Sequence, residues 1–155
     1  IAYSRGNVGA GLFISHFGEP TAVDELNPNV AVLKLFPGIT KDQLIHFFNT
    51  PDLAAVVVET YGAGNAPSSD WFKEALEHGQ KLGIIIVNIT QCQAGSVRQG
   101  KYETSSSFSE LGVVSGRDLT TEAAVTKLMY LLGRYTDKEE VMQKISEPIC
   151  GELTL

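Results

Sequence analysis

The sequence is poor in cysteine, in positive charge and in long hydrophobic runs. Only two cysteines, Cys92 and Cys150, occur among 155 residues, too few for a disulfide scaffold, so we expect a reducing, cytoplasmic location. Twelve Lys and Arg residues stand against 18 Asp and Glu residues, a net charge of −6, which argues against a nucleic-acid partner. No apolar stretch approaches the roughly 20 residues of a membrane-spanning helix, and no signal peptide is visible. We therefore expect neither a membrane nor a nucleic-acid function.

Hydrophobic residues make up 43% of the chain, enough for the core of one globular domain. Residues 1–29 are rich in Gly and Pro and keep no helical period, which predicts a linker or extended entry segment before the domain rather than part of its core. Residues 30–155 then alternate short apolar runs with amphipathic segments. The apolar runs predict strands at Val30–Phe36, Ala54–Val58, Ile84–Val87 and Val113–Val114.

The amphipathic segments predict helices with recognisable caps. The residues expected at their boundaries are Thr40 and Gln43 for the first helix, Ser68 or Ser69 and Gly83 for the second, Thr120 or Asp118 and Gly133 for the third, and Thr136 and about Ile145 for the last. A further short helix is expected at Ser105–Leu111. Strands that are apolar on both faces indicate a parallel sheet covered on both sides. The sequence thus predicts a three-layer α/β/α domain of about four parallel strands, similar to flavodoxin or Rossmann domains.

The loop after the second predicted strand, Glu59–Pro67, is the first candidate site. Ligands of open parallel sheets bind at the carboxyl ends of the strands, and glycines such as Gly62 and Gly64 let a backbone approach a ligand closely. Asn65 offers both a donor and an acceptor. The plain alternatives are a tight turn for the glycines and a helix cap for Asn65. The loop also resembles half of a dinucleotide fingerprint, which leaves a nucleotide or flavin binder open.

The loop after the third predicted strand, Asn88–Cys92, brings together a threonine, an amide and a thiol, which could line a polar pocket. A nucleophilic Cys92 or Thr90 needs a base to activate it, and no histidine lies near either residue in the sequence. The three histidines and two cysteines also lack the spacing of metal ligands. The sequence therefore predicts no complete catalytic site and no metal site within this chain.

Several stretches are distinctive as sequences: Leu35–Ile39 (LFPGI), Glu59–Pro67 (ETYGAGNAP), Val87–Cys92 (VNITQC), Gly112–Leu132 and Gly151–Thr154 (GELT). In order and spacing they resemble the smaller, C-terminal domain of the cytoplasmic-type (type I) L-asparaginases. The resemblance covers roughly residues 30–154. It implies hydrolysis of the side-chain amide of L-asparagine to L-aspartate and ammonia, with no metal or organic cofactor.

The resemblance also implies where the chemistry lies. The family's catalytic threonines and its Lys-Asp pair belong to an N-terminal domain outside this chain, so we expect no catalytic residue here and no activity of the chain alone. Family members are homo-oligomers, dimers or tetramers, in which this domain completes the active site of a neighbouring subunit. Asn65 would then help to orient the substrate in trans, and Tyr61 and Gly64 would shape its loop. Some members respond to asparagine at a regulatory site, which would lie here near Thr90 and Cys92.

The chain departs from the family pattern at two places. Tyr102–Ser105 replaces a common Tyr-x-Thr-Gly segment, and Glu59 stands where some members carry a basic residue. Related domains occur in amidotransferase subunits that act on tRNA and in homologues named lysophospholipases. An asparagine-sensing or assembly module is therefore a second hypothesis, beside the asparaginase domain.

Overall fold

In a computed structural model of the chain, the described residues are 25–92, 95–97, 108 and 110–154. Their strands form one parallel sheet in the consecutive order β1-β2-β3-β4. The strands are β1 (Val30–Lys34), β2 (Ala55–Thr60), β3 (Ile85–Thr90) and β4 (Val114–Ser115). The parallel α/β fold expected from the apolar runs is thereby confirmed.

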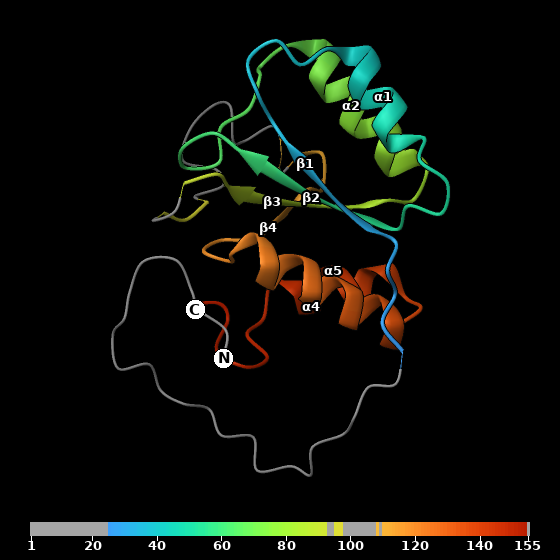
Figure 1. The fold of residues 1–155 in the computed structure, drawn as a ribbon, viewed down its shortest axis with the longest axis vertical. Coiled ribbons are helices and arrows are strands. Elements are labelled where there is room, and N and C mark those ends of the chain that lie inside the picture. Colours follow the sequence, from blue (N-terminus) through green and yellow to red (C-terminus); the bar gives the residue numbers. More distant parts are fainter. Residues whose placement is uncertain (1–24, 93–94, 98–107, 109, 155) are drawn as a thin grey trace.

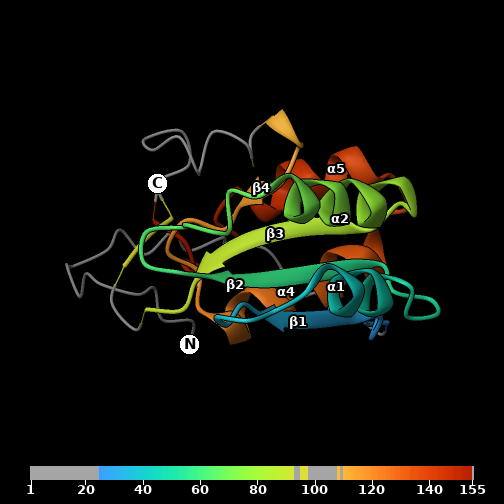
Figure 2. The same cartoon turned by 90° about the horizontal axis from the view of Figure 1, so that it is seen from above.

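Helices cover both faces of this sheet (Figure 1). Helices α1 (Lys41–Phe48) and α2 (Asp70–Lys81) lie on one face, and α4 (Thr121–Arg134) and α5 (Lys138–Ile145) lie on the other. Figure 2 shows the sheet between the two helical layers from above. Consecutive strands run parallel because each of the first two crossovers is a helix that returns the chain to the same end of the sheet. All strand carboxyl ends therefore meet at one edge.

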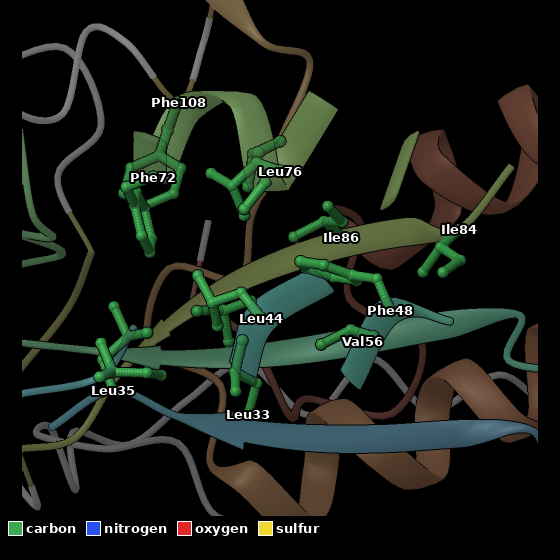
Figure 3. Packing of buried hydrophobic residues seen from close by; sticks show 14 residues of the cluster. Leu33, Leu35, Leu44, Phe48, Val56, Phe72, Leu76, Ile84, Ile86 and Phe108 are labelled. Carbon is green, nitrogen blue, oxygen red and sulfur yellow. The ribbon is translucent and has the colours of Figure 1, made fainter. Parts of the chain in front are cut away.

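Alternate residues of β2 and β3 face the two helical layers. Figure 3 shows Phe48 of α1 next to Val56 and Ile86 of the sheet, with Phe72 and Leu76 of α2 in the same cluster. The opposite face packs the other residues of the same strands against α4 and α5. Since both faces are covered, both strands are buried along their whole length, as expected for a parallel sheet.

The helix caps agree with the sequence prediction in part. Thr40 and Gln43 form the expected capping box, and Thr120, not Asp118, caps α4. Ser69 occupies the N-cap of α2, but its hydroxyl has no partner among the described residues. The last helix is capped by Asp137, which accepts from the backbone of Glu139, so the capping box expected one residue earlier, at Thr136, is wrong.

The prediction that Gly133 ends a helix is also wrong, because α4 continues to Arg134. A Cβ at Gly133 would lie 2.2 Å from the carbonyl oxygen of Glu25. The glycine therefore allows the described end of the leading segment to cross the helix, where Asn27 also donates to the carbonyl of Met129 at 3.0 Å. The rest of that segment, residues 1–24, and most of the helix expected at Ser105–Leu111 lie outside the described residues.

Within the described ranges, no helix is both long enough and apolar enough to cross a membrane.

Candidate functional site at the carboxyl edge of the sheet

Both central strands extend beyond their apolar runs. Glu59 and Thr60 belong to β2, and Asn88 to Thr90 belong to β3, although the sequence predicted these residues as loops. The ladder continues in register as far as the pair Thr60 and Thr90. Polar side chains can lie in these buried strands because each of them makes at least one hydrogen bond near the sheet.

Three neutral side chains, Thr60, Asn88 and Thr90, form what we call the polar platform. They lie on the face that carries α1 and α2, in alternation with buried apolar residues of the same strands, and all three are 0% exposed. The Thr60 hydroxyl lies 2.7 Å from Oδ1 of Asn88 and 2.9 Å from the carbonyl oxygen of Ile89. The Thr90 hydroxyl donates to the carbonyl of Gly62 and accepts from the backbone of Cys92 at 3.0 Å.

A tight turn, Tyr61–Asn65, lies over this platform. Tyr61 and Asn65 exchange two backbone hydrogen bonds of 2.8 Å each, and Gly64 also donates to the carbonyl of Tyr61 at 3.1 Å. Helix α2 begins five residues after Asn65, so Asn65 is not the helix cap that was the alternative. Its side chain is half-buried at the carboxyl edge. The structure places Tyr61, Gly64 and Asn65 in this one turn, and the role of Asn65 at a site stays a prediction.

Gly64 allows the turn to approach the sheet. Its φ of +104° is a conformation that residues with a Cβ rarely adopt. A Cβ at this position would lie 2.8 Å from Cγ1 of Val97 and 3.4 Å from Nδ2 of Asn88. The turn thus rests directly on β3 and on the segment that contains Val97. This close contact fixes the residue that follows, Asn65.

Glu59 lies at the same edge but on the opposite face of the sheet. Its carboxylate accepts from the hydroxyl of Thr121 at the start of α4 and lies 3.4 Å from Nζ of Lys34. Gln91 links the ends of two neighbouring strands, because its amide nitrogen Nε2 donates to the backbone carbonyls of Leu35 (2.6 Å) and Glu59 (2.8 Å). The carboxylate of Glu59 is held by Thr121 and Lys34.

The two residues expected at a regulatory site, Thr90 and Cys92, are close to each other but differ in environment. Thr90 is buried under the turn, whereas Cys92 is exposed. The hydroxyl of Thr90 is hydrogen-bonded both to Gly62 in the turn and to the backbone of Cys92. Thr90 therefore links the turn that carries Asn65 to the segment at Cys92. No group of His, Cys, Asp and Glu able to hold a metal ion occurs in the part of the chain that the structure describes.

A second buried polar cluster lies near the end of the described chain; we call it the tail clamp and define it as Lys127, Glu152 and Asp118, with the exposed Thr154 as the partner of Asp118. Nζ of Lys127 lies 2.7 Å from Oε1 of Glu152, and both side chains are 4% exposed. Lys127 also donates to two backbone carbonyls, that of Ile145 (3.0 Å), the last residue of α5, and that of Glu147, just after the helix. The clamp therefore joins α4, α5 and the tail.

Glu152 also accepts from the backbone N–H groups of Cys150 (2.8 Å) and Ile149 (3.1 Å). Burial alone would raise the pKa of its carboxyl group, but the hydrogen bonds from Lys127 and from this backbone outweigh it and lower the pKa to about 2. The Glu152 side chain is thus a carboxylate with a full set of donors. Asp118 holds the last described residue, accepting from the backbone of Thr154 at 3.0 Å and from its hydroxyl at 2.5 Å.

Sequence reasoning placed Asn88 in the candidate loop Asn88–Cys92 without singling it out, and it missed Lys127. Asn88 carried a signal, since it is the one amide inside the apolar run Val87–Ile89, and a polar residue in a buried strand requires a local partner. Lys127 carried none, because its partner Glu152 lies 25 positions away and reaches it only when the tail folds back over α4.

Comparisons with known proteins agree with this architecture. Residues 29–144 match the family model described as the glutaminase/asparaginase C-terminal domain. L-asparaginase 1 of Escherichia coli K12 is 36% identical over 154 residues, covering 94% of this chain and 45% of that protein. The 60 kDa lysophospholipase of Mus musculus is 37% identical over 134 residues, covering 84% and 23%.

The crystal structure of L-asparaginase I from Vibrio cholerae has a TM-score of 0.83 and 36% identity, and the match covers 90% of this chain and 42% of that one. The chain therefore spans less than half the length of the relatives that it matches. The family model covers most of the chain, and the sheet, the helices and the sequence agree with it. The chain belongs to the glutaminase/asparaginase C-terminal domain family.

Proposed function

We propose that this chain is the C-terminal domain of an L-asparaginase, that it acts on L-asparagine together with an N-terminal domain, and that it contributes Asn65 to the active site of a neighbouring subunit. The observation that carries the proposal is the Tyr61–Asn65 turn, which presents a half-buried amide at the carboxyl edge of the sheet. Ligands of parallel sheets bind at this edge. The names of the E. coli and V. cholerae relatives support asparagine as the substrate.

An amide at this position suits the substrate. Its oxygen and nitrogen can accept from the ammonium group and donate to the carboxylate of an amino acid, so that it orients the substrate without taking part in bond cleavage. Tyr61 and Gly64 hold the turn from which Asn65 projects. Orientation by such contacts contributes strongly to rate, because small displacements of a reacting group are costly.

Activity of the full-length protein tests the proposal. Hydrolysis of asparagine, followed as ammonia release, is expected from the full-length protein and not from this chain alone. Asn65→Ala should lower kcat/KM by about 100-fold. Asn49→Ala is a matched control, because Asn49 lies at the end of α1, away from the carboxyl edge, and bonds His78 at 3.0 Å. Unchanged full-length activity in Asn65→Ala would overturn the assignment of the site.

The proposal extends to assembly and location. A residue that acts in trans requires a homo-oligomer, a dimer or tetramer, and sedimentation of the full-length protein should show one. Cys150 is an exposed cysteine that forms no disulfide, which fits a reducing cytoplasm. A monomer that retains full activity would exclude the contribution in trans.

Thr90 and Cys92 are proposed as an effector site for asparagine. The supporting observation is that Thr90 bonds both the Asn65 turn and the backbone of Cys92, so a ligand at Cys92 would have a direct contact path to Asn65. Calorimetric titration of this chain with millimolar asparagine should release heat, and Thr90→Val should abolish it. Absence of heat in the unmodified chain would remove the effector site and leave the role of Asn65 untouched.

A further inference from the structure

The side-chain amide of Asn88 is incompletely satisfied within the platform. Oδ1 accepts from the hydroxyl of Thr60 at 2.7 Å, whereas Nδ2 has no hydrogen-bond partner among the described residues although the side chain is 0% exposed. Turning the amide over would place the nitrogen beside Thr60 and leave the oxygen unpaired instead. An unpaired buried amide is unfavourable in either orientation, so the residue calls for an explanation.

The unpaired group points at the underside of the turn that carries Asn65. A Cβ on Gly64 would lie 3.4 Å from Nδ2 of Asn88, and Gly64 is the residue directly before Asn65. The other bonds of the turn are already made: the carbonyl of Tyr61 accepts from Gly64 and Asn65, and the carbonyl of Gly62 accepts from Thr90. A small shift of the turn towards β3 would bring a backbone carbonyl within reach of the Asn88 donor.

We propose that Asn88 is a positioning residue that acts through Asn65. Its Nδ2–H bonds a backbone carbonyl of the Tyr61–Asn65 turn when Asn65 contacts the substrate, and so stabilises the substrate-bound position of the turn. Thr60 fixes the amide in place and burial keeps water away from it, which makes the donor ready without further ordering. This inference rests on the proposed function, because it takes Asn65 as the residue that contacts substrate.

Kinetics of the full-length protein test the role. Asn88→Leu keeps the branched shape of the side chain but has no donor, and should lower kcat/KM about tenfold. Its urea midpoint should not fall, because the variant also removes the unpaired polar group. Thr60→Val keeps the donor but loses the bond that orients it, and should lower kcat/KM about threefold. Asn49→Leu, a matched amide deletion at the end of α1, should leave kcat/KM unchanged.

A double-mutant cycle separates positioning from a structural role. Because Asn88 acts through Asn65, adding Asn88→Leu to Asn65→Ala should cause no further loss of kcat/KM. If the two losses multiply, or if Asn88→Leu alone stays within twofold of the unmodified protein, the positioning role is overturned. If Asn65→Ala itself has no effect, it is the proposed function that fails. The two failures are therefore distinguishable in the same set of four proteins.

Discussion

The polar platform and the tail clamp are both buried, but their groups are satisfied to different degrees. In the clamp, the ammonium group of Lys127 has three acceptors and the carboxylate of Glu152 accepts from Lys127 and from two backbone N–H groups. In the platform, Nδ2 of Asn88 has no partner among the residues described. An unpaired charge in the interior costs far more than an unpaired amide. Among the described residues of these two clusters, the unpaired group is thus a neutral amide, whereas the buried charges of the clamp are paired.

This difference separates groups that stabilise the fold from groups that serve a site. Unsatisfied or strained groups in native proteins concentrate at functional sites, and Asn88 lies directly beneath the turn of Asn65. The clamp instead closes α4, α5 and the tail on one another. We therefore expect substitutions in the clamp to lower stability and substitutions near the platform to lower activity.

The largest effect is expected from Lys127→Met. The substitution leaves the buried Glu152 carboxylate without its cation, and breaking a buried pair in this way costs about 3–5 kcal/mol. Equilibrium unfolding in urea measures the loss. The double variant Lys127→Met/Glu152→Gln is the control, because the neutral amide still accepts from the backbone of Cys150 and should recover most of the stability. If the single variant lowers the free energy of unfolding by less than about 1 kcal/mol, the clamp is no stronger than an ordinary surface ion pair. The clamp and the platform would then not differ in their contribution to stability.

Gly64→Ala should have the next largest effect, now on the platform side. The new Cβ meets Val97 at 2.8 Å and the φ of +104° is unfavourable for alanine, a combined cost of about 2–4 kcal/mol. The displaced turn should also lower kcat/KM in the full-length protein. Gly62→Ala is the matched control, since its Cβ would come no closer than 3.9 Å to its nearest neighbour, Nδ2 of Asn65. Equal losses in the two variants would show that close packing of the turn against the sheet is unimportant.

Acid should weaken the clamp before the platform. The pKa of Glu152 is lowered from its ordinary value of 4.5 to about 2 in the folded chain. Its contribution is therefore complete above about pH 5 and is lost as the pH falls towards 2, and about 2 kcal/mol should disappear between pH 6 and pH 3. Urea unfolding of the unmodified chain and of Glu152→Gln at both pH values isolates the contribution of Glu152 to the free energy of unfolding. A pH dependence that is the same in both proteins would contradict it.

How far the sequence predicts these regions depends on the range of the contacts involved. The parallel sheet follows from apolar runs such as Ala54–Val58, and the caps at Thr40 and Thr120 follow from local chemistry. Asn65 was found because a short amide after a strand is visible in the sequence, although its role in catalysis stays a prediction. In contrast, the sequence predicts a loop at Glu59 and Thr60, because the hydrophobic run ends at Val58. In the structure the backbone pairing of β2 with β3 continues to Thr60, and the Thr60 hydroxyl bonds Asn88 of the neighbouring strand.

Long-range contacts account for the errors at Gly133 and Lys127. Gly133 predicts a helix end, but it lies within α4, where a glycine is needed because the backbone of Glu25 crosses the helix. Lys127 was not singled out because a lysine on a helix is usually exposed, and only the return of the tail buries it. Glu25 and Glu152 are both far in sequence from the residues that they contact. A single sequence therefore predicts the helices, the strands and a candidate site, but not contacts such as Lys127 with Glu152 or Thr60 with Asn88.

The smallest effect is expected at Cys150, whose thiol lies 3.3 Å from Oε2 of Glu152. Burial, the hydrogen bond to Glu152 and the charge of that carboxylate raise the pKa of the thiol above its ordinary value of 9.0. The neutral thiol is a weak donor, and Lys127 with the backbone already satisfies Glu152. Cys150→Ala should therefore change the stability by less than about 0.5 kcal/mol, and Cys150 should alkylate more slowly at pH 8 than an unperturbed cysteine. A loss comparable to that of Lys127→Met would mean that the thiol, and not the ammonium group, holds the carboxylate in place.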